Sequence, residues 1–251
     1  IFLVVSNSFK SRKGIFNDPM AVPTAETFST IGFDKVLGRS NFDVYFLNSI
    51  TVTVMTLGIT LLIGAMAAWA LAGYKYRLNT LLAFYLAIGI MVPIRLGTVS
   101  ILKLVVAMGL MNSLTALILV YIAMSLPLTI FILNEFMQQI PNDLKEAARC
   151  DGVSEYRIFF QIILPLTKPA IATVGVFTMV PVWNDLWFPL ILTADDSVRT
   201  VTLGVQQFVG QYVTDWNSVL ASLTLAIVPV FILYIIFSRQ LIRGITAGAV
   251  K

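Results

Sequence analysis

The stretch Ile140-Pro-Asn-Asp-Leu-Lys-Glu-Ala-Ala-Arg-Cys-Asp-Gly152 is a short polar interruption between apolar stretches long enough to span a bilayer. Its residues predict a short helix. Pro141 suits the first helical turn, where a missing N–H costs nothing, and Asp143 and Glu146 place negative charge near the positive end of the helix dipole. Gly152 predicts the end of the helix, because glycine accepts the left-handed conformation that commonly closes one.

The composition is that of an integral membrane protein. Hydrophobic residues make up 58% of the chain, charged residues only 12%, and the mean hydropathy is +0.87. Three uncharged runs each meet the roughly 20 residues needed to cross a hydrocarbon core. They lie between Asp43 and Lys75, between Lys103 and Glu135, and between Asp215 and Arg239. We expect one helix in each run.

Two further spans are expected with interruptions. One lies near 81–102 and is broken at its outer end by Pro93 and Arg95, and the other begins near Ile158 and is bent by Pro165. Residues 1–5 have the character of the tail of a truncated first span, which gives about six transmembrane helices. Runs of this length exclude barrel strands, so the prediction is an all-α polytopic fold.

Residue types that carry most enzyme chemistry are missing. The chain has no His and one Cys, so His-based acid–base chemistry, Cys–His nucleophiles and zinc sites are not available. No segment has the pattern of a phosphate-binding loop. We therefore expect no catalytic residues and no metal site. The net charge of +4 is spread over several loops and gives no reason to expect a nucleic-acid partner.

The quoted stretch resembles the "EAA" cytoplasmic loop in the membrane subunits of bacterial ABC importers. The pattern is Glu-Ala-Ala, three residues, Gly, and an apolar stretch that closes on Leu-Pro. The matching residues here are Glu146, Ala147, Ala148, Gly152, Leu164 and Pro165. In that family the loop forms a coupling helix that docks on a separate ATPase subunit. The resemblance implies that the ATPase-coupling residues are Asp143, Leu144, Glu146, Ala147, Ala148, Asp151 and Gly152.

Other segments extend the resemblance over nearly the whole chain. Tyr45-Phe-Leu-Asn-Ser49 and Trp183-Asn184 followed by Pro189-Leu190 are similar to segments of sugar-type permeases. The carboxyl end from Arg243 to Lys251 is similar to the tail of the second membrane subunit type of the maltose importer. Within this tail, Gly244, Gly248 and Lys251 are candidate ATPase contacts, and we expect an extended path because glycine permits one.

The resemblance implies a type I ABC importer permease fold: one transmembrane domain over residues 1–251, an external loop at 6–41 and a cytoplasmic coupling loop at 140–157. It implies a multi-pass protein of the bacterial inner membrane that works by alternating access. The implied partners are a second homologous permease, two ATPase subunits, an extracytoplasmic substrate-binding protein and membrane lipid. No cofactor is expected in this chain, because ATP and Mg²⁺ would sit on the ATPase subunits.

The transported molecule is expected to be a sugar or sugar derivative. The alternatives are a secondary transporter for small polar solutes and a permease for glycerophosphate-type substrates. Candidate pathway residues are Trp183, Asn184, Asp185 and Arg95. A carboxylate in or near the membrane usually faces a cavity or a partner, but Asp185 could equally mark the end of a helix at the outer interface. Arg95 could reach the headgroups, and Trp183 could be an interface residue.

Overall fold

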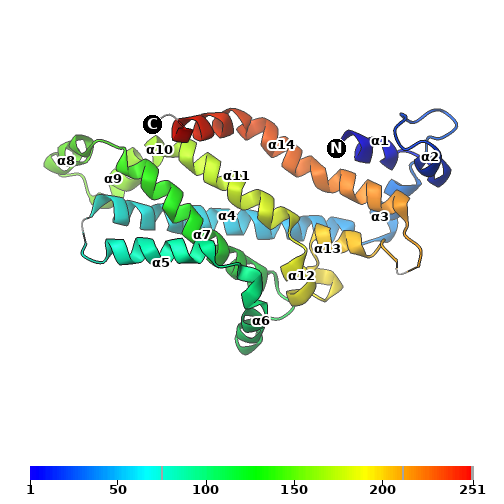
Figure 1. Cartoon of the computed structure of the whole chain (residues 1–251), viewed down its shortest axis with the longest axis horizontal. Helices are drawn as coiled ribbons and strands as arrows, with labels where there is room; N and C mark the ends of the chain where they lie inside the picture. Colours follow the sequence, from blue (N-terminus) through cyan, green and yellow to red (C-terminus); the bar gives the residue numbers. More distant parts are fainter. Residues whose placement is uncertain (75, 211, 250–251) are drawn as a thin grey trace. The chain divides into compact units, whose positions relative to one another are not determined.

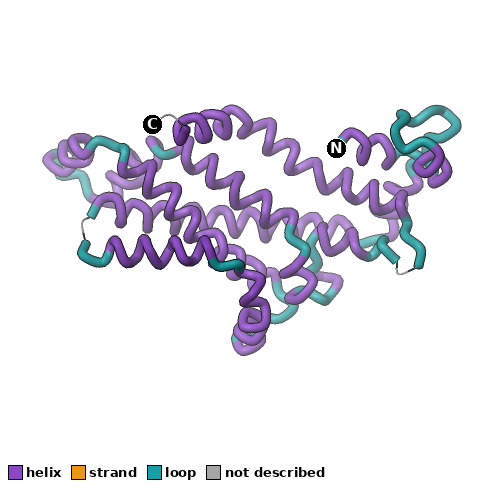
Figure 2. Tube along the Cα trace, viewed as in Figure 1, coloured by secondary structure: helices purple, strands orange, loops and turns teal. Residues whose placement is uncertain are grey.

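The computed structural model describes residues 1–74, 76–210 and 212–249, and this part of the chain is helical and contains no strand (Figures 1 and 2). The elements are α1 (Phe2–Ser8), α2 (Arg12–Asn17), α3 (Ile31–Arg39), α4 (Phe42–Gly73), α5 (Asn79–Met91), η1 (Ile94–Gly97), α6 (Thr98–Ala107), α7 (Leu114–Gln138), α8 (Asn142–Cys150), α9 (Glu155–Ile158), the π-helical η2 (Phe159–Ile163), α10 (Leu164–Leu166), α11 (Lys168–Asn184), α12 (Trp187–Leu192), η3 (Asp196–Val198), α13 (Val201–Gln206) and α14 (Trp216–Ala249).

The chain divides into two compact units. The first comprises residues 1–52, 105–117 and 183–235, and the second comprises residues 53–104, 118–182 and 236–251. Each unit has its own apolar core. The expectation of one transmembrane domain over residues 1–251 stays a prediction.

The core of the second unit lies where α4, α7, α9, η2 and α11 meet. Its fully buried side chains include Leu133, Met137, Ile158 and Ile163, and Trp69 near the end of α4 packs against the same cluster. Small residues of α4 and α11, among them Ala65 and Ala170, also belong to this cluster. Small side chains let helix backbones approach closely, which is how helices pack in a bilayer.

Among the residues that the structure describes, two single helices are long and apolar enough to cross a membrane, namely α4 and α7. Two bent pairs satisfy the same test when each is counted as one span: α5 with η1 and α6, and α9 to α10 with α11. Within α14, residues Trp216–Ile232 form a shorter apolar stretch. The expected helix between Asp43 and Lys75 is thus confirmed, whereas the count of about six spans stays a prediction.

The expected helix between Lys103 and Glu135 is confirmed as α7, but it begins later than the uncharged run does. Residues up to Ala107 complete α6, and α7 begins only at Leu114. The connection contains Gly109 at φ +67° and Asn112 at φ +54°. Both backbones are left-handed, and a right-handed helix cannot continue through such residues.

The interruptions predicted at the prolines are confirmed. The chain bends by 85° between α5 and the η1–α6 segment, at Pro93, and by 75° between the α9–α10 segment and α11. At the second bend the Thr167 hydroxyl donates to the carbonyls of Ile163 at 3.0 Å and Leu164 at 3.1 Å. The Ile163 carbonyl also accepts the Thr167 N–H at 3.0 Å, so the hydroxyl adds a second bond to this acceptor. Such bonds from a threonine hydroxyl to the preceding turn often accompany a bend in a helix.

The segment expected as an external loop, residues 6–41, contains helices α2 and α3 and the end of α1. It is well bonded within the first unit. The buried Lys10 ammonium donates to the Asp18 carbonyl at 2.8 Å, and Asn217 donates to the Lys10 carbonyl at 2.6 Å. At the segment's far end, Lys35 forms an ion pair of 2.7 Å with Asp215.

Candidate functional site

The predicted short helix is α8, and it lies with α9 at the end of the second unit where α4 and α7 also end (Figure 1). Pro141 is the N-cap residue, one position before the helix. The face exposed to solvent carries four of the predicted coupling residues, namely Asp143, Leu144, Glu146 and Ala147. The opposite face is buried. The exposed side is therefore a surface of two acids and two apolar groups that a partner can contact.

Ala148 lies on the buried face, where 7% of its surface is exposed, and it packs against the core of the second unit. As predicted coupling residues, Ala147 and Ala148 were both expected to be exposed. For Ala148 this is wrong, because successive residues on a helix point about 100° apart and the core occupies its side. Leu144, one turn earlier on the helix, is 47% exposed.

The end of α8 is a Schellman motif. Gly152 has φ +71°, its N–H donates to the Arg149 carbonyl at 3.0 Å, and the N–H of Val153 donates to the Ala148 carbonyl at 3.0 Å. No neighbouring atom lies within 4 Å of the position that a Gly152 Cβ would occupy. The glycine is thus required for its backbone angle alone, and the predicted left-handed helix end is confirmed.

Lys145 is a buried cation on α8. Only 3% of its surface is exposed, its Nζ lies 5.3 Å from the centroid of the Trp69 ring, and Nζ donates to Asn142 Oδ1 at 3.2 Å. Burial lowers the pKa of the Lys145 ammonium, and the positive charge of Arg149 lowers it further. The contact joins the middle of α8 to α4.

A second polar contact joins α8 to α9. Arg149 Nε lies 2.6 Å from Glu155 Oε1, and Nη2 lies 3.4 Å from Oε2, so both carboxylate oxygens are engaged. The hydrogen bond from Arg149 lowers the pKa of Glu155. Tyr74, directly after α4, shares this carboxylate, and burial together with the Glu155 hydrogen bond raises the pKa of Tyr74. The pair is partly exposed, so its contribution to stability is small.

The first unit holds a cavity of about 620 Å³ lined by the end of α11, α13 and α14. Trp183 and Asn184, two of the predicted pathway residues, belong to its wall. The wall also contains Thr202 and Gln206 from α13 and Tyr234 from α14, and none of its described residues is Asp, Glu, Lys or Arg. Amides, a hydroxyl and aromatic groups are the usual contacts of an uncharged polar ligand.

The other two predicted pathway residues lie elsewhere. The Asp185 carboxylate accepts from the N–H groups of Trp187 at 3.4 Å and Phe188 at 3.0 Å, so it serves the start of α12. Arg95 belongs to η1 in the second unit. Trp183 itself is anchored, because its indole Nε1 donates to the Ala226 carbonyl at 3.1 Å.

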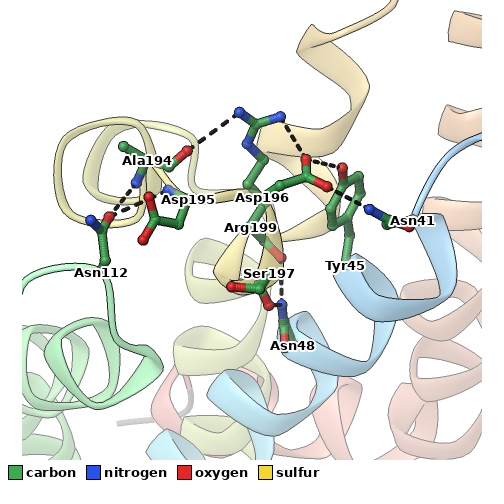
Figure 3. A network of polar contacts seen from close by, with 9 residues as sticks. All are labelled: Asn41, Tyr45, Asn48, Asn112, Ala194, Asp195, Asp196, Ser197 and Arg199. Carbon is green, nitrogen blue, oxygen red and sulfur yellow. Dashed lines mark hydrogen bonds and ion pairs between the residues drawn. The ribbon is translucent and has the colours of Figure 1, made fainter.

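A polar network fixes the segment before α13 to the start of α4 (Figure 3). The Asp196 carboxylate accepts from the Tyr45 hydroxyl and from Asn41 Nδ2, each at 2.5 Å, and from Arg199 Nη1 at 2.9 Å. Asn48 Nδ2 donates to the carbonyls of Ser197 and Arg199, both at 2.9 Å. The network therefore positions α13, and with it one wall of the cavity.

Two close contacts complete this arrangement. The Asn112 side-chain oxygen accepts from the N–H groups of Ala194 at 2.9 Å and Asp195 at 3.3 Å (Figure 3). Gly204 of α13 lies directly against the Tyr45 ring, which a Cβ at this position would overlap. The Asn48-Ser49 pair noted in the sequence thus has a structural task, since Ser49 Oγ also accepts from the Val201 N–H at 2.9 Å.

The carboxyl-terminal tail differs from the expected extended path. Gly244 and Gly248 lie in α14, which continues as a helix to Ala249. Lys251 lies outside the described residues. Contact of the tail with an ATPase stays a prediction.

Sequence reasoning missed Lys145, Trp69 and the cavity residues of α13. A lysine in a polar loop is normally solvated, and nothing in the local pattern places it against an aromatic ring of a distant helix. The Asp196 network was missed because its partners lie about 150 residues apart in the chain.

Comparison with known proteins identifies the family. The family of binding-protein-dependent transport system inner membrane components matches residues 41–247. The diacetylchitobiose uptake system permease protein NgcG of Streptomyces coelicolor is 31% identical over 250 residues, which cover 99% of this chain and 82% of NgcG. The melibiose/raffinose/stachyose import permease protein MelC of Bacillus subtilis is 31% identical over 252 residues, which cover 100% of this chain and 90% of MelC.

A solved structure has the same fold. It is the crystal structure of a bacterial ABC transporter involved in the import of the acidic polysaccharide alginate, and one of its chains matches with a TM-score of 0.80 at 20% identity, over 94% of this chain and 88% of that one. The resemblance to carbohydrate-type ABC importer permeases and the predicted all-α permease fold are thereby confirmed. Since the family match runs from the residue before α4 deep into α14, this chain belongs to the binding-protein-dependent transport system inner membrane components.

Proposed function

We propose that the chain is the permease subunit of an ATP-driven importer that takes up a sugar or sugar derivative from an extracytoplasmic binding protein and works by alternating access. Family membership supports transport rather than catalysis. The names of NgcG and MelC support a di- or oligosaccharide substrate. This chain catalyses no bond change, and hydrolysis of ATP belongs to partner subunits.

The observation that carries the coupling part of the proposal is the exposed face of α8. Helix α8 lies at one end of the second unit, and its buried face packs on the core of that unit. Its outer face exposes Asp143, Leu144, Glu146 and Ala147 to solvent. Such a surface suits docking of an ATPase subunit. The proposed assembly holds two ATPase subunits, which carry ATP and Mg²⁺, and a second homologous permease. Asp151 and Gly152 set the direction in which the chain leaves this surface.

The cavity of the first unit is the proposed contribution to the sugar pathway. Its uncharged wall, with Asn184, Thr202 and Gln206, matches a hydroxyl-rich neutral solute better than a phosphate, which normally requires Arg, Lys or a helix N-terminus. This favours sugars over the glycerophosphate-type alternative.

Reconstitution tests the function. The chain is purified with its second permease and ATPase subunits, placed in liposomes, and given labelled di- and oligosaccharides with a binding protein outside and ATP inside. We expect uptake that requires both ATP and the binding protein, and no hydrolysis by the isolated chain. Uptake without ATP by the chain alone would instead establish a secondary transporter, and hydrolysis by the pure chain would contradict the assignment.

The orientation of the coupling loop can be tested with Cys150, the only cysteine of the chain, which is exposed at the end of α8. We propose that this loop is cytoplasmic. A membrane-impermeant maleimide should therefore label Cys150 in inside-out vesicles and leave it unlabelled in intact spheroplasts. The control is Cys150→Ser combined with Met20→Cys, since Met20 is 71% exposed in the segment expected outside. It should show the reverse pattern, and labelling of Cys150 in spheroplasts would overturn the orientation.

A further inference from the structure

Lys145 is unusual among the charged groups of the coupling region, because it is buried without an anion. Within the described part of the chain, the ion pairs of this region involve Arg149 and Glu155, and no carboxylate lies within ion-pair distance of Lys145. Its contacts are the Trp69 ring at 5.3 Å and Asn142 Oδ1 at 3.2 Å. Asn142 belongs to α8 itself, so the cation–π contact with Trp69 is what connects the Lys145 ammonium to another helix.

An apolar side chain would fill the same space without a desolvation penalty, so packing alone does not explain a lysine here. A cation over an aromatic face adds an attraction that depends on position and that strengthens away from water. The ring is itself fixed, since Trp69 is 6% exposed and packs in the core of the second unit. The Trp69 ring therefore moves together with α4. A displacement of α8 acts on α4 through the contact between the Lys145 ammonium and this ring.

We propose that Lys145 is a positioning residue that fixes α8 to α4, so that a displacement of the coupling helix by the ATPase is passed directly to α4 as well as along the chain to α9 and α11. This inference rests on the proposed docking of an ATPase at α8. The contact of Glu155 with Tyr74 and Arg149 lies at the same end of α4. It is a second, partly exposed connection between α4, α8 and α9.

The test uses variants of the assembled importer that change either the Lys145 side chain or the Trp69 ring. Lys145→Met keeps the stem of the side chain and removes the cation, whereas Lys145→Arg keeps the cation over the ring. We expect Lys145→Met to assemble and to hydrolyse ATP, with at least a five-fold loss in sugar transported per ATP, and Lys145→Arg to stay within two-fold of the unchanged protein. Lys103→Met is the matched control, because Lys103 is an exposed lysine of α6 in the same unit.

Variants of the ring provide an independent measurement should Lys145→Met fold poorly. Trp69→Phe weakens the cation–π contact and Trp69→Leu removes it, so transport per ATP should fall in the order Trp, Phe, Leu. Lys145→Met should add little to the loss already caused by Trp69→Leu, as expected for two residues that act through one contact. Equal transport per ATP with Trp, Phe and Leu at position 69, or fully additive losses, would overturn the proposal.

The mobility of a nitroxide label on Cys150 can be measured independently of transport. With cysteine-free partner subunits, Lys145→Met should raise the mobility of the label, and Lys145→Arg should not. Ala147→Trp, on the docking face, separates the two hypotheses. If it leaves uptake normal, the docking of an ATPase at α8 is wrong. If it stops uptake while Lys145→Met transports normally, docking stands and the link through Lys145 is wrong.

Discussion

Gly152→Val is expected to leave the permease in the membrane and to reduce sugar uptake by the assembled importer by roughly 5- to 30-fold. The residue holds φ +71° at the end of α8, and a β-branched side chain at such an angle costs about 1 to 2 kcal/mol, which corresponds to that factor. We expect this strain to be relieved by breaking the hydrogen bonds of the Schellman motif. The orientation of α8 relative to α9 then changes. Uptake, ATPase co-purification and membrane abundance are measured in parallel.

Gly152→Asn is the matched control for this change. Asn adds a side chain of similar size but accepts the left-handed conformation, and no atom lies within 4 Å of the added Cβ to obstruct it. It should retain most of the uptake. If Val and Asn are equally harmful, the backbone angle is not the cause. If both are harmless, the segment is an ordinary linker and the coupling proposal fails.

The local features of the coupling segment could be predicted because they depend on neighbouring residues. Proline and acidic residues at the start, and Gly152 at the end, defined a helix that the structure places at Asn142–Cys150. The bend near Pro165 follows from the same kind of local reasoning. Each of these outcomes is fixed by backbone sterics within a few residues, so no knowledge of the tertiary fold was required.

The faces of α8 could not be predicted in this way. A helix this short has too few turns to show which side is apolar, and its sequence carries a lysine on the side that proves to be buried. The burial of Lys145 and Ala148 is decided by the core around Trp69, far away in the chain. The helix start at Leu114 was missed for a related reason, since the uncharged run contains a left-handed Asn112 that hydropathy does not detect.

The second large effect is expected at Ala147. Its side chain is exposed on the same face as Asp143, and the small group leaves room for the backbone of a docked protein. Ala147→Trp should insert normally into the membrane and lose at least about ten-fold in ATPase co-purification and in uptake, since a ten-fold loss of binding needs only about 1.4 kcal/mol. Membrane abundance, measured by quantitative blotting, should stay unchanged.

Ala148→Trp is an informative comparison with Ala147→Trp, because the side chain at position 148 points into the core. Ala148 is 7% exposed and packs in the cluster that contains Trp69, so a Trp there overpacks the core. We expect Ala148→Trp to lower the abundance and thermal stability of the permease itself, even without an ATPase present. Ala147→Trp should lower neither, and only its assembly with the ATPase should fail. The opposite pattern would mean that α8 is rotated about its axis in the assembled importer, and that Ala148 rather than Ala147 meets the partner.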